Sequence, residues 1–213
     1  MKLFGFPYSH NTRKVLATLH ATGLACEFEI VDIVAKKSYD ADYVAMNPTG
    51  LTPCLQDGDF TLWESNAILI YLCEKAGDTT LWPADSQARA DVLRWLFWQN
   101  AHWNPGLDII LIERLVKRLE AGEGPDPAEE RRGEDFFHKQ EAAPALEGIL
   151  SSRDFVTGAA PTLADFAVAS HLQYKDVAAY PLDRYPNIRA WYERVSALEP
   201  WATTEPDWAA LTG

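Results

Sequence analysis

Two short polar segments carry the side chains best suited to chemistry in this sequence. In the segment 7–15 (PYSHNTRKV), Ser9 and Asn11 lie at the expected start of a helix. A second helix is expected to begin at Glu64-Ser65, directly after a strand. The N-terminus of a helix carries partial positive charge and N–H groups without intrahelical partners. Both positions are therefore suited to holding an anion.

The elements expected around these positions alternate between strand and helix. Residues 2–6 and 26–31 are short and rich in aromatic and β-branched residues, which favours strands, and helical spacing between them ends at Gly23. A hairpin turn is expected at residues 57–59, before the helix that starts at Ser65. The predicted order is strand, helix, strand, followed by strand, strand, helix.

The chain after residue 86 has helical character throughout. Apolar residues recur at helical spacing over 87–120, where the sequence Asn-Pro-Gly at 104–106 is expected to kink or break the helix. Further helices are expected at about 128–150, 162–179 and 187–197.

Composition excludes several classes of protein. The 213 residues carry a formal net charge of −12, which excludes a general nucleic-acid binder that neutralises phosphates. No run approaches the roughly 20 apolar residues that span a bilayer, and the N-terminus lacks the apolar stretch of a secretory signal, so we expect a cytoplasmic protein without membrane contact. Three cysteines without a CxxC pair indicate neither a disulfide framework nor a zinc site.

The most specific motif lies between the two expected α/β units, in the segment 46–55 (MNPTGLTPCL). Thr52-Pro53 in this segment, with Glu64-Ser65 a short distance later, resembles the signature of the thioredoxin-like domain of glutathione transferases. The resemblance implies that the Thr52–Pro53 peptide bond is cis. It also implies that the backbone N–H and C=O of Thr52 pair with the cysteinyl backbone of glutathione, as one added residue of β-strand.

In that family pattern the second helix start binds the γ-glutamyl group. The Ser65 hydroxyl and N–H would hold the carboxylate, and Glu64 would pair with the ammonium group, whereas an ordinary helix cap is the structural alternative for Ser65. Many relatives continue with arginine where this chain has Asn66, which removes one cationic contact. Lys37 is a candidate for the glycyl carboxylate, with a solvated charge as the alternative.

The first helix start is where the resembling families activate the thiol of glutathione. A free thiol with a pKa of about 8.5 is mostly protonated at neutral pH, and a hydrogen-bond donor together with the helix dipole lowers that pKa. Ser9 matches the serine-type families by position, and Asn11 matches a bacterial group with a Thr-x-Asn pair. Tyr8 is a further candidate, and a cap alone is the structural alternative. His10 is expected to be exposed to solvent.

An aromatic segment in the helical part provides candidates for the second-substrate pocket. The segment 94–103 (RWLFWQNAHW) resembles the first helix of the all-helical domain in the bacterial group. Trp98, His102 and Trp103 would suit an apolar electrophile, although an aromatic stripe at helical spacing also fits a core or a dimer interface. APTLADFAVA at 160–169 resembles a structural capping box of the family.

The resemblance spans nearly the whole chain and implies a two-domain protein of the α/β plus all-α class, of the bacterial serine-type or Nu-like group. Residues 1–77 would form the thioredoxin-like glutathione-binding domain, 78–86 a linker, and 87–213 an all-helical substrate-binding domain. The implied assembly is a homodimer.

The implied activity is that of a glutathione transferase, with glutathione as co-substrate, no metal, and a small apolar electrophile as second substrate. Glutathione-dependent reduction of a disulfide or hydroperoxide is an alternative, in which a second glutathione replaces the electrophile. A binding protein that keeps the fold without catalysis is the third possibility.

Overall fold

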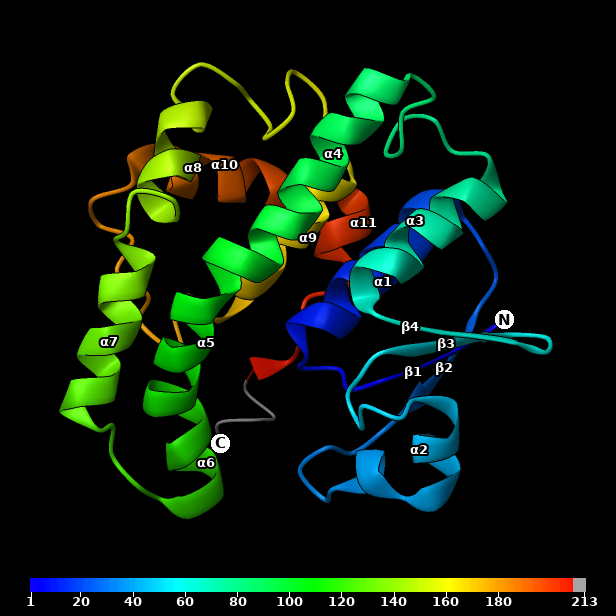
Figure 1. The fold of residues 1–213 in the computed structure, drawn as a ribbon, viewed down its shortest axis with the longest axis horizontal. Helices are drawn as coiled ribbons and strands as arrows, with labels where there is room; N and C mark the ends of the chain where they lie inside the picture. The colour runs from blue at the N-terminus through cyan, green and yellow to red at the C-terminus, as the bar shows by residue number, and fades with distance from the viewer. Residues whose placement is uncertain (209–213) are drawn as a thin grey trace. The chain divides into compact units, whose positions relative to one another are not determined.

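The structure, a computed structural model, describes residues 1–208. The chain forms two compact units (Figure 1): Met1–Trp82 together with the segment that begins at Ser196, and Pro83–Val195. Among the described residues, no helix combines the length and the apolar character that crossing a membrane requires.

The first unit is built on a four-stranded sheet in the order β2-β1-β3-β4. The strands are β1 (Lys2–Gly5), β2 (Glu27–Ile30), β3 (Cys54–Asp57) and β4 (Phe60–Trp63). Strand β1 pairs in parallel with β2 and antiparallel with β3, and β3 pairs antiparallel with β4. The predicted order of elements and the hairpin are confirmed.

Helices cover both faces of this sheet. They are α1 (His10–Thr22), α2 (Ala41–Met46) and α3 (Ser65–Ala76), and Figure 1 shows α1 and α3 on one side of the sheet and α2 on the other. Side chains alternate along a strand, so Phe4 and Cys54 form a cluster with Tyr43 of α2. The neighbouring Leu3 and Leu55 are fully buried. The sheet is thus a central layer between two apolar layers.

A short helix from the end of the chain, α11 (Glu199–Ala202), packs against α1. The guanidinium of Arg13, itself 1% exposed, lies 4.5 Å from the centre of the Trp201 ring and forms an ion pair with Glu205. Local helical periodicity grouped this segment with the helical domain, whereas its long-range contacts with Arg13 place it in the first unit.

The second unit is entirely helical. Its helices are α4 (Ser86–Trp98), α5 (Asn104–Leu111), α6 (Lys117–Ala121), α7 (Pro127–Phe137), α8 (Ala143–Leu150), α9 (Leu163–Ala169) and α10 (Pro186–Ser196). A π-helical segment, Gln99–Trp103, connects α4 to α5, so the helix changes its geometry directly before residues 104–106 without being broken there. The single helix predicted at 128–150 is wrong, because Pro144 falls in the first turn of α8, where a proline starts a new helix.

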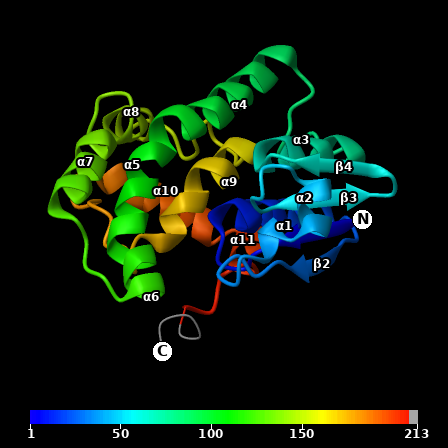
Figure 2. The same cartoon turned by 60° about the horizontal axis from the view of Figure 1, so that its bottom comes forward.

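Two glycines allow close packing of α5 against α7, which lie side by side in Figure 1 and Figure 2. A Cβ atom on Gly106 would lie 2.8 Å from the backbone nitrogen of Phe137, and one on Gly133 would lie 2.9 Å from the Ile110 side chain. The backbones therefore approach each other more closely than larger residues permit.

Candidate functional site

The first helix start is capped by Ser9. Its backbone is extended, with φ −77° and ψ 125°, and its Oγ accepts a hydrogen bond from the Thr12 N–H at 3.4 Å. The first turn of α1 holds no acidic residue that would neutralise the positive helix end. Because the cap uses a lone pair of the hydroxyl oxygen, the hydroxyl proton can still be donated. Capping and donation to an anion are compatible roles for Ser9.

Asn11 connects the two helix starts. The Ser65 hydroxyl donates a hydrogen bond to Oδ1 of Asn11 at 3.1 Å. Within residues 1–208 the Nδ2 amide group of Asn11, which is half-buried, donates no hydrogen bond. Since the carbonyl oxygen is occupied by Ser65, Asn11 presents its N–H donors to whatever binds between the two helix ends.

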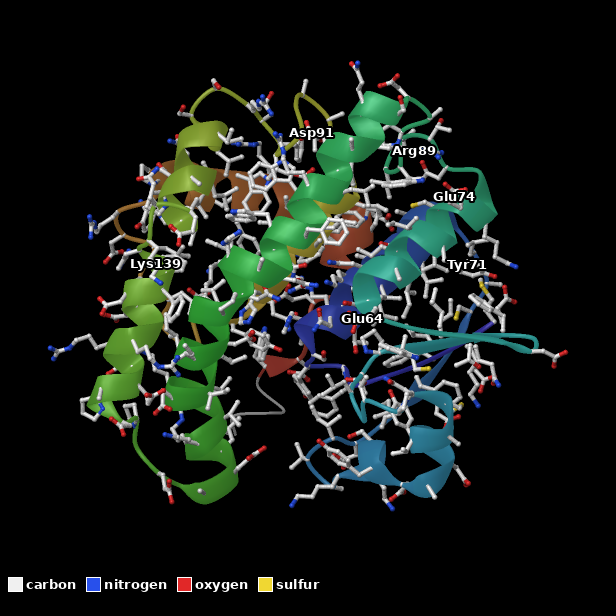
Figure 3. All side chains as sticks on the ribbon, viewed as in Figure 1. Glu64, Tyr71, Glu74, Arg89, Asp91 and Lys139 are labelled. Carbon is white, nitrogen blue, oxygen red and sulfur yellow. The ribbon has the colours of Figure 1, made fainter. Side chains whose placement is uncertain are left out.

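The second helix start has a different geometry from the first. Glu64 occupies the N-cap position with φ 71° and ψ 103°, a conformation that is rare for a residue with a side chain, and it makes no side-chain cap bond. Its carboxylate is exposed and, in the described part of the chain, forms no ion pair. Figure 3 labels Glu64 at the N-terminal end of α3. Unusual backbone conformations of this kind concentrate at binding sites.

Ser65 is the first residue of α3 and does not cap it. The alternative of an ordinary Ser65 cap is therefore wrong, because the left-handed turn at Glu64 moves the cap position back by one residue. With the hydroxyl directed to Asn11, the first N–H groups of α3 have no side-chain cap from within the turn. They remain available to an anion.

The register of the β3–β4 hairpin brings the two sequence motifs together. Cys54, the first residue of β3, pairs with Trp63, the last residue of β4, so Thr52-Pro53 directly before β3 and Glu64-Ser65 directly after β4 adjoin the same end of the hairpin. The Thr52–Pro53 peptide bond is cis, as the resemblance implied. Motifs separated by about a dozen residues in sequence thus lie at one end of the same hairpin.

A buried lysine behind this site was not anticipated from the sequence. Lys14 lies on α1, is 0% exposed, and its Nζ donates a hydrogen bond to Oδ1 of Asn66 at 2.7 Å. Burial lowers the pKa of Lys14 from 10.5 to about 7, and the nearby Glu64 carboxylate opposes that shift. The available signal was its position three residues after Asn11, which places both residues on one face of the helix.

The remaining candidate site residues of the first unit are Lys37, Tyr8 and His10. Lys37 begins a 3₁₀ turn and pairs with Asp40 at 3.3 Å, with 60% of its side chain exposed. The Tyr8 hydroxyl donates to the backbone oxygen of Asp207 at 3.1 Å, and the Tyr8 ring packs against Trp208. His10 is half-buried as the first residue of α1, so its expected exposure to solvent is only partial.

The cysteines of the first unit are poorly suited to thiol chemistry. Cys54 and Cys73 are fully buried, and burial raises the pKa of Cys54 to about 11 and that of Cys73 to about 12. Burial also raises the pKa of Cys26, which is partly exposed. At neutral pH these thiols are protonated and react slowly as nucleophiles.

The aromatic candidates belong to the second unit. Trp103 is fully buried and donates its indole N–H to the backbone oxygen of Val168 at 3.0 Å, which is typical of a core residue. Trp98 stacks on Trp103 with ring centres 5.7 Å apart, and it is half-buried. His102 is exposed. Of the three, Trp98 and His102 are accessible to a ligand.

Two family models match the chain. The N-terminal domain of glutathione S-transferase matches residues 3–80, and the C-terminal domain of glutathione S-transferase matches residues 140–194. A probable glutathione S-transferase from rice (Oryza sativa subsp. japonica) is 32% identical over 202 residues, which cover 92% of each chain.

Solved structures resemble the chain over almost its full length. Glutathione transferase F7 from Populus trichocarpa is 28% identical, with a TM-score of 0.85, and the match covers 95% of this chain and 96% of that one. A glutathione S-transferase from Pseudomonas fluorescens is 30% identical, with a TM-score of 0.80, and the match covers 93% and 96%.

Proposed function

Because the chain belongs to the glutathione S-transferase family, we propose that it is a glutathione transferase, which binds glutathione on its first unit and presents the thiolate to a small electrophile. The observation that carries this proposal is the pair of donors, the Ser9 hydroxyl and the Asn11 amide, at the N-terminus of α1, whose first turn holds no acidic residue. The narrower assignment to a bacterial serine-type or Nu-like group stays a prediction.

The proposed reaction begins with the thiol of glutathione near the start of α1. Donation from Ser9, assisted by the Asn11 N–H groups and the positive helix end, stabilises S⁻ relative to S–H and lowers the thiol pKa. The thiolate then attacks the electrophilic carbon and forms a C–S bond, and the leaving group departs with the electron pair of its bond. The proton released from the thiol passes to solvent.

The rest of glutathione is proposed to bind along the end of the β3–β4 hairpin. The backbone of Thr52, before Pro53, pairs with the cysteinyl backbone as an added strand residue. The Ser65 N–H and hydroxyl hold the γ-glutamyl carboxylate, and the Glu64 carboxylate pairs with the ammonium group. Lys37 is the candidate for the glycyl carboxylate, for which it must leave Asp40.

The second substrate is proposed to be a small apolar electrophile. Trp98 and His102 are the accessible candidates to contact it, and Trp103 supports Trp98 from the core. Reduction of a disulfide or hydroperoxide is the competing activity. The buried, protonated state of Cys54 and Cys73 favours a second glutathione rather than a protein thiol as the reductant in that reaction.

Calorimetric titration with reduced glutathione tests the binding site. We expect saturable binding in the micromolar to millimolar range, lost in Ser65→Ala. Ser86→Ala is the matched control, because Ser86 is also the first residue of a helix, α4, but lies in the second unit. Absence of binding to the unsubstituted protein would refute the proposal and favour a non-catalytic role.

A substrate panel separates the enzymatic activities. Conjugation of aryl halides faster than reduction of 2-hydroxyethyl disulfide or cumene hydroperoxide is the expected result. The reverse order of rates would assign the protein to glutathione-dependent reduction.

We also propose a cytoplasmic homodimer, in which the first unit of one protomer contacts the second unit of its partner. Leu51 of the first unit is 61% exposed and Phe97 of the second is 72% exposed, and burying such side chains favours association. Sedimentation is expected to give twice the chain mass of 23.9 kDa. A species at the single-chain mass at micromolar concentration would contradict the dimer.

A further inference from the structure

The loop that connects α2 to β3 has one carbonyl group, that of Leu51, held by two side chains. The Tyr43 hydroxyl donates a hydrogen bond to this oxygen at 2.6 Å, and the Asn47 side-chain amide donates another at 2.7 Å. Both donors belong to buried residues, whereas the Leu51 side chain is exposed. The Leu51 carbonyl oxygen therefore points into the first unit.

The Leu51 oxygen and the Thr52 N–H belong to the same peptide group. This group is trans. In a planar trans peptide group the C=O and the N–H point in opposite directions. Since Tyr43 and Asn47 fix the oxygen toward the interior, they also direct the Thr52 N–H away from the interior.

The backbone of Thr52 has hydrogen-bonding groups to offer. Within residues 1–208, neither the N–H nor the C=O of this half-buried residue takes part in a hydrogen bond. Two residues later, Cys54 begins β3, which pairs with β1 on one side and with β4 on the other. Thr52 thus precedes a fully paired strand with its own backbone unpaired, which suits the addition of a peptide strand.

The Tyr43 hydroxyl is placed by the apolar core and not by the loop. Its ring packs in the cluster between α2 and the sheet, with its centre 6.5 Å from that of Phe4. Burial raises the pKa of Tyr43 to about 12, so the hydroxyl keeps its proton at neutral pH and acts as a donor. A residue fixed in the core therefore sets the position of an oxygen in the loop.

Asn47 and Gly50 restrict the loop further. Oδ1 of Asn47 accepts hydrogen bonds from the Thr49 N–H at 3.1 Å and the Thr49 hydroxyl at 2.7 Å. Gly50 has φ 66°, and a Cβ atom there would lie 2.8 Å from the Tyr39 ring. The loop is thus tightly bonded within itself, and the Tyr43 hydroxyl ties it to the core.

We propose that Tyr43 is a positioning residue, whose hydroxyl holds the Leu51–Thr52 peptide group so that the Thr52 N–H meets the cysteinyl carbonyl of glutathione. The inference rests on the proposed function, because it concerns the same glutathione site. Tyr43 touches no ligand atom and acts through the plane of one peptide group. Its hydroxyl therefore raises the affinity for ligands whose central residue offers a backbone carbonyl.

Calorimetry with two ligands and two variants tests the proposal. The ligands are S-hexylglutathione and its analogue in which an (E)-alkene replaces the cysteinyl–glycyl peptide bond, which keeps the shape of the bond and removes the carbonyl. Tyr43→Phe removes the hydroxyl and keeps the ring in the core. Tyr71→Phe is the matched control, because it also removes a hydroxyl that donates a hydrogen bond, to Asp57 at the opposite end of β3.

We expect Tyr43→Phe to weaken binding of S-hexylglutathione about fivefold, which is the effect of one lost hydrogen bond. The alkene analogue is expected to bind more weakly than S-hexylglutathione to the unsubstituted protein, and equally to the unsubstituted protein and Tyr43→Phe. Tyr71→Phe is expected to leave both affinities unchanged. The thiol pKa of bound glutathione is also expected to be unchanged in Tyr43→Phe, because Ser9 and Asn11 act on the sulfur.

Equal weakening of both ligands by Tyr43→Phe would overturn the proposal, because a merely structural role predicts that result. Unchanged binding of S-hexylglutathione in this variant would overturn it while leaving the glutathione site intact. Equal binding of the two ligands to the unsubstituted protein would do the same, because the Thr52 N–H would then not meet the carbonyl. If the unsubstituted protein does not bind S-hexylglutathione, the proposed function itself fails, and this inference fails with it.

Discussion

The starts of α1 and α3 carry the same partial charge but are built in opposite ways. Ser9 has ordinary extended backbone and caps α1 with its side chain, whereas Glu64 has φ 71° and leaves α3 without a side-chain cap. At the start of α1, the Ser9 hydroxyl oxygen accepts a hydrogen bond from a backbone N–H of the helix. The hydroxyl proton of Ser9 can still be donated to a ligand. The second start keeps its N–H groups open and has the buried Lys14 side chain behind it, bonded to Asn66. Under the proposed function, the start of α1 would activate the thiol of glutathione and the start of α3 would bind its γ-glutamyl group.

The largest expected effect is on catalysis at the α1 start. Ser9→Ala removes a donor to the developing thiolate, and we expect kcat/KM to fall about 100-fold, as on loss of one donor from an oxyanion site. The pKa of bound glutathione, measured by the thiolate absorbance against pH, is expected to rise. Ser9→Thr, which keeps a hydroxyl, serves as the control.

Asn11→Ala distinguishes the two candidate donors. A larger loss of activity in this variant than in Ser9→Ala would make Asn11 the leading group. Unchanged turnover and thiol pKa in Ser9→Ala would reduce Ser9 to a helix cap.

The pH dependence of stability tests the burial of Lys14. The pKa of this ammonium group is about 7 in the folded protein and near 10.5 when unfolded, so between these values the unfolded chain binds more protons. Stability of the unsubstituted protein relative to Lys14→Met should therefore rise with pH, by about 1 kcal/mol per pH unit between pH 7 and 10. Below pH 7 the full cost is present and Lys14→Met is the more stable form. Urea unfolding of both proteins at several pH values measures this difference, and parallel pH profiles would contradict it.

The backbone conformation of Glu64 at the start of α3 predicts a smaller effect on stability than the burial of Lys14 does. Glu64→Gly and Glu64→Ala both remove the carboxylate, and both should weaken glutathione binding to the same extent. Only glycine relieves the left-handed conformation, so Glu64→Gly is expected to be more stable than Glu64→Ala by about 1 kcal/mol. Thermal unfolding of the two variants checks the difference, and equal melting temperatures would argue against strain at Glu64.

The smallest expected effect is on the free energy of unfolding, when Ser9 or Ser65 is replaced by alanine. Ser9→Ala should lower the free energy of unfolding by about 1 kcal/mol, because it removes the N-cap of α1. Ser65→Ala removes no cap and is expected to cost less, with one side-chain hydrogen bond to Asn11 lost. Urea unfolding compares the two, and a larger loss in Ser65→Ala would reverse the roles assigned to the two serines.

Local sequence patterns predicted the elements of the first unit well. Short β-branched and aromatic runs indicated the strands, and Gly23 was predicted to end α1, which it does with φ 67°. The pattern failed where two local signals conflict, helical periodicity and a proline. Residues 128–150 have continuous helical character, but Pro144 starts a new helix there.

Several features depend on contacts between residues that are distant in the sequence, and helical or strand periodicity does not reveal these contacts. The segment around Trp201 is helical by pattern, and only its contact with Arg13 assigns it to the unit that holds the sheet. Ser65 has the residue type of a cap, and only the backbone at Glu64 shows that it is not one.

The sequence by itself determined the residue types of the site and their order, because strand, turn and helix preferences are local and place Ser9, Asn11, Glu64 and Ser65 at helix starts. Only the tertiary structure decided how these residues act together. The hydrogen bond from Ser65 to Asn11 and the burial of Lys14 beneath Asn66 depend on the packing of α1 against α3. Burial, which changes the pKa of a charged group, is a property of the packed chain, so the sequence pattern around Lys14 could not reveal it.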